Sequence, residues 1–179
     1  MWSQDAYKRA LDFAAHAHGD QLVPGSGFPY VVHLTKVAME VMTACVADPE
    51  LDADLAIACA LLHDSIEDAG VTRSQVEAEF GARVAAGVAA LSKNAALAKS
   101  EQMADSLRRI RACSREVWIV KLADRITNLE PPPSHWPIEK RISYQKEARL
   151  IRERLRGASD LLEKRIEAKI ADYAAHCPG

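Results

Sequence analysis

The spacing of apolar residues constrains this chain more than any other feature of its sequence. Apolar side chains recur every three or four residues along nearly the whole length, as they do on one face of a helix, whereas alternating runs rich in Val, Ile and Thr are scarce. With 179 residues, 49% of them hydrophobic, the chain can bury a substantial core. We therefore expect an all-α bundle of about eight to ten helices, folded as a single domain over residues 1–179.

The same spacing, together with Pro and Gly, predicts where helices begin and end. Residues 20–29 contain two Pro and two Gly and must form a loop, and Gly70 suits a left-handed helix cap. Thr72 to Gln75 has the form of a capping box, and the run Pro131 to Pro133 is the sharpest break in the chain. The predicted helices cover residues 4–18, 31–45, 53–67, 82–91, 99–112, 115–129, 138–155 and 160–175, with one more beginning at the capping box.

Composition excludes several classes of protein. The net charge of −2 argues against a protein that binds long nucleic acid, which requires a basic surface. No stretch approaches the apolar length of a membrane span, and charged residues interrupt the first twenty positions, so we expect neither a membrane protein nor a signal peptide. The four cysteines form no C-x-x-C pair and are expected to be reduced thiols, in keeping with a cytoplasmic location.

The segment from residue 61 to residue 68, LLHDSIED, places four ionisable groups at the end of the most apolar predicted helix. On a continuous helix, His63 would stack on Glu67 and Asp64 on Asp68, giving one buried cluster. Burying several carboxylates is costly unless a cation compensates their charge. Imidazole and carboxylate together suit Mn, Fe or Zn better than Ca, so the segment predicts a divalent-metal site.

Two isolated polar residues on other apolar helices could complete this site. His33 follows soon after the predicted loop, and Asp124 lies in an apolar segment between Lys121 and Arg125. Each has a simpler interpretation, because a single histidine on an apolar face is often a hydrogen-bonded core residue. An aspartate flanked by cations can likewise be an ordinary salt-bridge partner. If both side chains reach the His63-Asp64 pair, the metal interpretation is favoured.

Three blocks of sequence together resemble the HD-domain superfamily of metal-dependent phosphohydrolases. The residues of these blocks and their order along the chain are similar to those of the hydrolase domain of the Rel/Spo stringent-response enzymes and of the stand-alone small alarmone hydrolases. The blocks are Pro29-Tyr30-Val31-Val32-His33, Ala60-Leu61-Leu62-His63-Asp64-Ser65-Ile66-Glu67-Asp68, and Val120-Lys121-Leu122-Ala123-Asp124-Arg125-Ile126-Thr127-Asn128-Leu129. A His-Asp dipeptide alone has no diagnostic value, but the three blocks in this order are specific.

The resemblance implies a helical HD-type fold, and it implies roles for particular residues. His33, His63, Asp64 and Asp124 would be the ligands of a divalent metal, usually Mn(II). Glu67 and Asp68 match the acidic pair that orients and activates the attacking water. Residues that would contact the substrate are Asn128, Lys99, Lys140 and Tyr144. The implied reaction removes the 3′-pyrophosphate of guanosine tetra- or pentaphosphate, giving GDP or GTP and pyrophosphate.

The sequence departs from the family in the loop before the Pro-Tyr-x-x-His block. Relatives generally carry Arg or Lys there, packed on the guanine, whereas this loop reads Gln-Leu-Val-Pro-Gly-Ser-Gly over residues 21–27. A cation stacked on a base contributes on the order of 1 kcal/mol. Its absence from this loop weakens the case that the protein recognises guanine. The metal chemistry does not depend on this loop.

Several alternatives stay open from the residues alone. The same site could serve a phosphatase that acts on NADPH or on a nucleoside monophosphate, or a regulatory module that binds a nucleotide without turnover. Intact Glu67 and Asp68 argue against the module. Beyond a small phosphorylated nucleotide no partner is specified, and a homodimer is left open. Five cations could bind phosphate but could equally be solvated surface residues: Lys93, Lys99, Lys121, Arg125 and Lys140.

Overall fold

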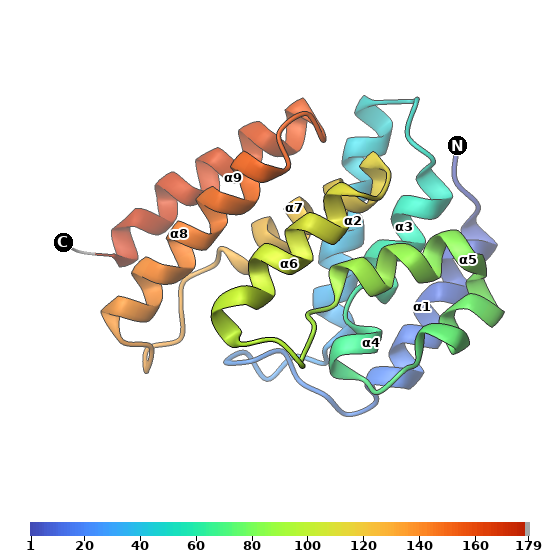
Figure 1. Ribbon diagram of the computed structural model, residues 1–179, viewed down its shortest axis with the longest axis horizontal. Helices are drawn as coiled ribbons and strands as arrows, with labels where there is room; N and C mark the ends of the chain where they lie inside the picture. Colours follow the sequence, from blue (N-terminus) through green and yellow to red (C-terminus); the bar gives the residue numbers. More distant parts are fainter. Residues whose placement is uncertain (178–179) are drawn as a thin grey trace.

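The chain folds as an assembly of helices, as the computed structural model shows for residues 1–177 (Figure 1). Among these residues there are nine α-helices, one short 3-10 helix and no β-strand, so the predicted all-α class is confirmed. The helices are α1 (Gln4–His18), α2 (Val31–Ala47), α3 (Ala53–Leu62), α4 (Ser65–Asp68), α5 (Arg73–Leu91), α6 (Lys99–Arg111), α7 (Arg115–Asn128), α8 (Ile138–Arg154), α9 (Asp160–Tyr173) and η1 (Ala174–His176).

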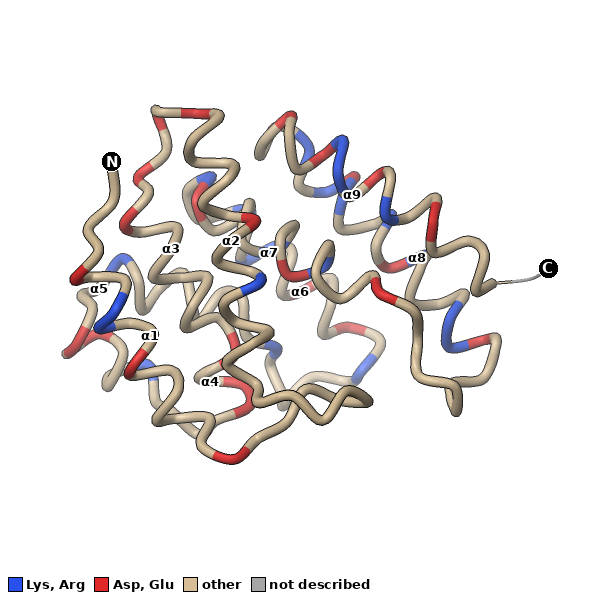
Figure 2. The backbone as a smooth tube through the Cα atoms, turned by 180° about the vertical axis from the view of Figure 1, so that it is seen from behind, with Lys and Arg blue, Asp and Glu red and all other residues tan. Residues whose placement is uncertain are grey.

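Helices α2, α3 and α7 form the centre of the molecule. Helix α3 packs against α1, α2, α5 and α7, and it carries few charged residues, as Figure 2 shows. Its apolar side chains face neighbours on most sides, which is why the sequence there is apolar all round. Fully buried side chains from the three helices include Leu34, Leu61, Leu62, Leu122 and Ile126. The predicted metal ligands on α2 and α7 and at the end of α3 therefore lie at the buried centre of the fold.

The helix predicted over residues 53–67 is interrupted, and this changes where its acidic residues lie. Helix α3 ends at Leu62, His63 and Asp64 form a turn, and the short helix α4 begins at Ser65. The prediction that His63 stacks on Glu67 along one continuous helix is therefore wrong. The break lets His63 and Asp64 remain in the core while Glu67 and Asp68 lie at the surface.

Helix α5 confirms the predicted capping box and corrects the boundary after it. The Thr72 hydroxyl accepts from the backbone N–H of Gln75, and the Gln75 side chain accepts from the Thr72 N–H. The predicted helix over 82–91 is the second half of α5, joined to the first half across a kink at Gly81. Gly81 has a φ of 84°, which other residues rarely adopt.

Helices α8 and α9 form an antiparallel pair at one end of the molecule, joined to α7 by the proline-rich segment of residues 130–137 (Figure 1). Their outer faces carry many Lys, Arg and Glu residues, as predicted (Figure 2). Tyr144 of α8 and Tyr173 of α9 face each other with ring centroids 6.0 Å apart. The pair thus brings aromatic side chains to the end of α7 that carries Asn128.

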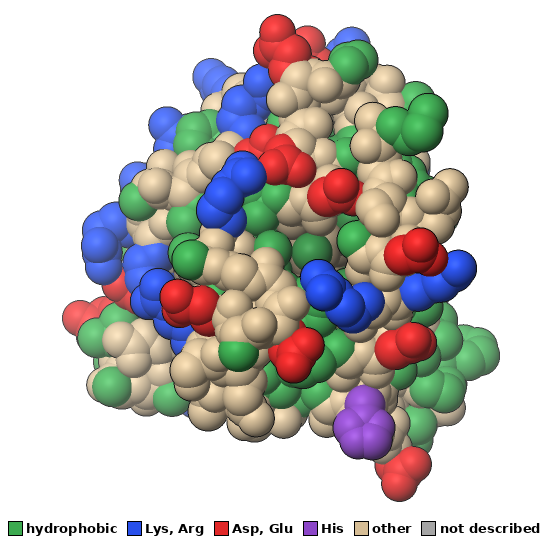
Figure 3. Space-filling view, turned by 90° about the vertical axis from the view of Figure 1, so that its right-hand side faces the viewer, with side chains coloured by type: hydrophobic (Ala, Val, Ile, Leu, Met, Phe, Trp, Pro, Cys, Tyr) green, Lys and Arg blue, Asp and Glu red, His purple; other side chains and the backbone are tan. Residues whose placement is uncertain are grey.

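The surface at the opposite end has no single charge character. Figure 3 shows the side of the molecule that lies to the right in Figure 1, where acidic, basic and hydrophobic side chains are interspersed. Within residues 1–177, none of the helices has both the length and the apolar character that crossing a membrane requires. All four cysteines are free thiols, as expected.

Candidate metal centre and the adjoining cavity

The structure brings together the four residues that the sequence proposed as metal ligands. His33 comes from α2, His63 and Asp64 from the turn between α3 and α4, and Asp124 from α7. His33, His63 and Asp124 are buried, with residue exposures of 5%, 3% and 8%. We call these four residues the metal cluster.

The donor atoms of the metal cluster meet at one point. The Nε2 atoms of His33 and His63 are 3.3 Å apart, and Asp64 Oδ2 lies 2.9 Å from His63 Nε2 and 3.8 Å from His33 Nε2. His33, His63 and Asp64 each place a ligand atom within 4.8 Å of the others. Asp124 Oδ1 joins them at 3.5 Å from His33 Nε2 and 3.7 Å from His63 Nε2.

The hydrogen bonding of His63 shows that this point suits a cation. His63 Nδ1 lies 2.8 Å from the carbonyl oxygen of Ala60 and must donate to it, which leaves Nε2 of the neutral ring as an acceptor. That acceptor then faces the carboxylate of Asp64, and two acceptors repel unless a positive charge lies between them. Burial opposes a charge on His63, but Asp64 and Asp124 outweigh burial and raise its pKa well above the usual value. The donor set of two imidazoles and two carboxylates fits a divalent metal.

Each aspartate of the metal cluster is held by neighbours outside it. Burial would raise the pKa of Asp64, but His63 and the Tyr30 hydroxyl, which donates to Oδ2 at 2.6 Å, lower it to about 2. Burial would likewise raise the pKa of Asp124, but Lys121 and the two histidines lower it well below the usual value. Both carboxylates are therefore ionised over the whole neutral range, as metal ligands must be.

Asp124 has two further contacts on its own helix. Lys121 Nζ donates to Asp124 Oδ2 at 3.0 Å, and Asn128 Nδ2 donates to Oδ1 at 2.6 Å. Asp124 is therefore a salt-bridge partner of Lys121, as one of the two interpretations from the sequence held. The contact with both histidines is what distinguishes Asp124 from an ordinary surface carboxylate.

The two remaining acids of the His-Asp segment differ in their contacts. Glu67 is fixed, because the backbone N–H of Lys93 donates to Oε2 at 2.7 Å and Lys93 Nζ donates to Oε1 at 2.9 Å. Among the described residues, none donates a hydrogen bond to the Asp68 side chain. Burial and the charges of Asp64 and Glu67 raise the pKa of Asp68. One acid is thus anchored, and its neighbour is free to exchange a proton.

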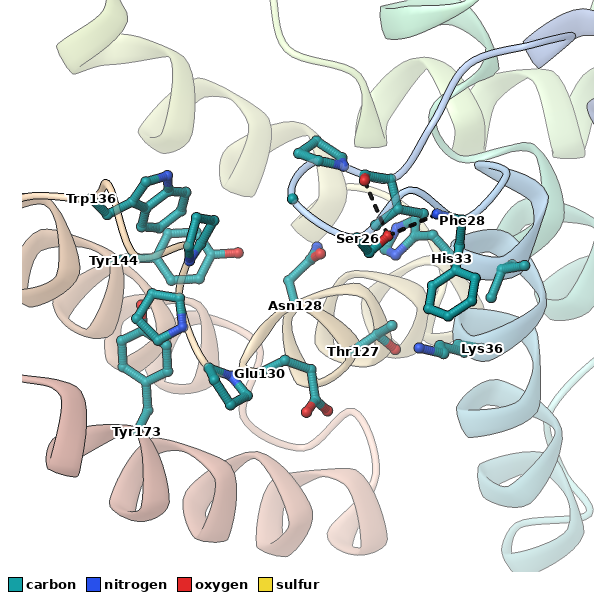
Figure 4. Close-up of a pocket in the computed structure, with 17 residues that line it drawn as sticks. Ser26, Phe28, His33, Lys36, Thr127, Asn128, Glu130, Trp136, Tyr144 and Tyr173 are labelled. Atoms are coloured by element: carbon teal, nitrogen blue, oxygen red, sulfur yellow. Dashed lines mark hydrogen bonds between the residues drawn. The ribbon is translucent and has the colours of Figure 1, made fainter.

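A cavity of about 400 Å³ adjoins the metal cluster and shares His33 with it (Figure 4). Trp136, Tyr144 and Tyr173 lie on one side of the cavity, and Phe28 and Lys36 lie on the other, with Asn128 between them. Two chain segments close the cavity: residues 23–28 of the loop before α2, and the prolines at 131–133. They touch closely, since a methyl group on Gly25 would come within 3.3 Å of the Pro133 ring.

Some of the residues predicted to contact substrate line the cavity, and others do not. Asn128 and Tyr144 line the cavity. Arg125 and Lys140 lie behind its aromatic wall, with the Arg125 guanidinium 4.2 Å from the Tyr144 ring centre and Lys140 Nζ 3.9 Å from that of Trp136. Lys99 begins helix α6 and does not line this cavity. Lys93 and Lys121 instead contact Glu67 and Asp124.

Some residues of the site were not singled out from the sequence. Lys36, one turn after His33 on α2, is the single Lys or Arg in the described lining of the cavity. Trp136 and Phe28 supply aromatic surface from loops. His18 stacks on Tyr30 beside the metal cluster. The available signal was position in the sequence: Lys36 shares a helix face with His33, and Trp136 lies three residues after the proline run.

Comparison with known proteins settles the family. A sequence model described as the HD domain matches residues 10–159, which include every residue of the metal cluster. The chain belongs to the HD domain family. HD domains bind divalent metals, and the His/Asp cluster of this HD domain has the donors for one.

Relatives of this HD domain share most of its length. It is 30% identical over 163 residues to a Danio rerio protein named guanosine-3′,5′-bis(diphosphate) 3′-pyrophosphohydrolase MESH1, and the match covers 88% of each chain. An Aquifex aeolicus guanosine-3′,5′-bis(diphosphate) 3′-pyrophosphohydrolase is 32% identical over 126 residues, which are 69% of this chain but only 17% of that protein. A solved structure titled as a metazoan ortholog of SpoT that hydrolyzes ppGpp superimposes with a TM-score of 0.82 at 25% identity, covering 96% and 97% of the two chains.

Proposed function

We propose that this chain is a Mn(II)-dependent guanosine-3′,5′-bis(diphosphate) 3′-pyrophosphohydrolase, which converts (p)ppGpp to GDP or GTP and pyrophosphate. The observation that carries the proposal is the convergence of His33, His63, Asp64 and Asp124 beside a cavity of nucleotide dimensions. A relative with that name that matches over 88% of both chains supports the substrate assignment.

The metal cluster would hold the ion through two imidazole nitrogens and two carboxylates, a donor set that suits Mn(II). When bound, the metal supplies a positive charge that lowers the pKa of a coordinated water and neutralises charge on phosphate oxygens. The protein's own contribution is the fixed orientation of the donors. His63 is oriented by the Ala60 carbonyl, and Asp124 by Lys121 and Asn128.

Asp68 and Glu67 would divide the handling of the attacking water. Asp68 accepts no hydrogen bond from the described residues, so its carboxylate can take the proton of the water. Glu67, with both oxygens held by Lys93, would orient that water without accepting its proton. As the water oxygen bonds to phosphorus, the bond from that phosphorus to the ribose O3′ breaks, and O3′ receives the proton that Asp68 took from the water.

The cavity would hold the nucleoside, with the base against an aromatic side chain. Trp136 and Tyr144 offer ring faces that can stack on a purine, and Asn128 lies between them and the metal cluster (Figure 4). Lys36 has no ion-pair partner among the described residues and would bind a phosphate group.

Product analysis tests the proposed function. The full-length protein, loaded with Mn(II), is incubated with guanosine tetraphosphate, NADPH and nucleoside monophosphates, and the products are separated by ion-exchange chromatography. Release of pyrophosphate and GDP in equal amounts is the expected result, with the Asp64→Asn variant as the inactive control. Release of orthophosphate alone would identify a phosphatase, and no turnover of any nucleotide would identify a binding module.

A further inference from the structure

Tyr30 connects the metal cluster to residues outside it. Its side chain is buried at 9% exposure, and its hydroxyl donates to Asp64 Oδ2 at 2.6 Å. The donor must be the tyrosine, because the ionised carboxylate can only accept. Asp64 Oδ2 also lies 2.9 Å from His63 Nε2, so this bond fixes the oxygen that points into the metal cluster.

His18, at the C-terminal end of α1, holds the Tyr30 ring from the other side. The two rings are stacked, with centroids 4.7 Å apart and planes 19° from parallel. His18 is 5% exposed, and its Nδ1 lies 2.8 Å from Gln21 Oε1, to which it donates. Its Nε2 is buried and has no hydrogen-bond partner among the described residues. Among the described residues, the bond to Gln21 is therefore the single hydrogen bond of the His18 ring, so Gln21 sets the orientation of that ring.

Gln21 contacts Tyr30 through its backbone as well as His18 through its side chain. The carbonyl oxygen of Gln21 accepts from the Tyr30 N–H at 2.8 Å, while its side chain holds His18. Gln21, His18 and Tyr30 therefore each contact the other two, and among the described residues the hydroxyl bond to Asp64 is the only side-chain hydrogen bond that leads out of the group. We call these three residues the tyrosine arm.

We propose that the tyrosine arm positions the metal cluster: the stacked His18 ring, anchored by Gln21, holds the Tyr30 hydroxyl where it fixes the carboxylate of Asp64. Partners that orient a metal ligand typically change metal affinity by 10- to 100-fold. The arm adds positioning residues to the site and assigns none of them a contact with substrate. The inference rests on the metal role proposed above but is independent of which nucleotide is hydrolysed.

Metal titration of the full-length protein tests the arm without any turnover. Mn(II) affinity is measured by isothermal titration calorimetry for the wild type and for Tyr30→Phe, which removes only the hydroxyl. We expect the Tyr30→Phe variant to bind Mn(II) about 10- to 100-fold more weakly. Tyr7→Phe, at a half-buried tyrosine of α1 outside the site, is the matched control and should bind as the wild type does.

A double-mutant cycle tests whether His18 acts through Tyr30. His18→Ala alone should weaken Mn(II) binding by about fivefold, and His18→Phe, which keeps a flat ring over Tyr30, should weaken it less. In the Tyr30→Phe background, His18→Ala should change the affinity by less than about twofold, because the hydroxyl that it positions is already gone. Circular dichroism melts of the metal-free variants check that each is folded, and His18→Phe replaces His18→Ala if the latter is not.

The Co(II) form provides a readout that loss of stability would not change. Visible absorption of bound Co(II) reports the geometry of its ligands, so Tyr30→Phe should shift the bands of the fully loaded protein. Wild-type affinity and spectrum in Tyr30→Phe would overturn the arm while leaving the metal site intact. Independent, multiplying losses in the cycle would overturn the role of His18. A wild type that binds no Mn(II) would overturn both the arm and the metal role.

Discussion

The metal cluster and the cavity share His33 but are built from different parts of the chain. The metal cluster draws its side chains from α2, α7 and the turn after α3, and these three helices also supply several fully buried leucines. The cavity is closed by residues 23–28 and by prolines 131–133, and its aromatic wall comes from Trp136 and the α8–α9 pair. The metal cluster is thus placed in the buried centre of the fold, whereas the cavity combines two loops with side chains from several helices.

This difference predicts how each region responds to substitution. A substitution in the metal cluster should abolish Mn(II) binding and, with it, turnover, because the four donors hold the ion together. A change in the cavity should adjust affinity by small factors, because several weak contacts share the binding of the substrate. Four experiments test the contrast, taken from the largest expected effect to the smallest.

Asp124→Ala should have the largest effect. Removing a buried carboxylate that contacts both histidines should abolish Mn(II) binding and turnover together. Mn(II) should also raise the melting temperature of the wild type by several degrees and leave that of the variant unchanged, because only the metal-binding protein is stabilised by the ion. Asp5→Ala, at an exposed acid of α1, is the control and should keep both properties. An Asp124→Ala protein that binds Mn(II) as tightly as the wild type would contradict the assignment.

Asp68→Asn should separate turnover from metal binding. The amide cannot take a proton, so kcat should fall by about 10²- to 10⁴-fold while Mn(II) affinity stays unchanged. Glu67→Gln should have a smaller effect on kcat, because its oxygens already accept from Lys93 and an orienting contact can survive in part. Steady-state kinetics of the two variants side by side decide the roles. If Glu67→Gln loses more activity than Asp68→Asn, the roles are reversed.

The contrast between the regions also explains what the sequence could predict. Helical spacing predicted α2 and α7, and the three blocks named four residues that the structure brings together, since helix periodicity places such side chains on buried faces. The turn at His63 and Asp64 was missed because the run before it is apolar all round and shows no boundary. The site of Lys36 and Trp136 depends on how the loop of residues 20–29 meets prolines 131–133, which is a tertiary contact without a local signature.

Lys36→Met should affect substrate binding without affecting the metal. Removing the ammonium group from the cavity should raise KM for guanosine tetraphosphate by about tenfold, with kcat little changed, since a phosphate contact away from the reacting atoms contributes equally to ground and transition states. Lys8→Met, at an exposed lysine of α1, is the control. A variant whose kcat falls while KM stays constant would place Lys36 at the scissile phosphate instead.

Val23→Arg should have the smallest effect and should improve binding. Val23 lines the cavity from the loop in which the resemblance to the Rel/Spo hydrolases leads us to expect a base-stacking cation, so an arginine there can pack on the guanine. Such a contact contributes on the order of 1 kcal/mol, which corresponds to a KM about fivefold lower for guanosine tetraphosphate. Leu22→Arg adds the same charge at a side chain that is 53% exposed and does not line the cavity, so it should leave KM within about twofold. Equal effects of the two arginines would mean that net charge attracts the substrate, whereas an effect of Val23→Arg alone would show that position in the loop decides it.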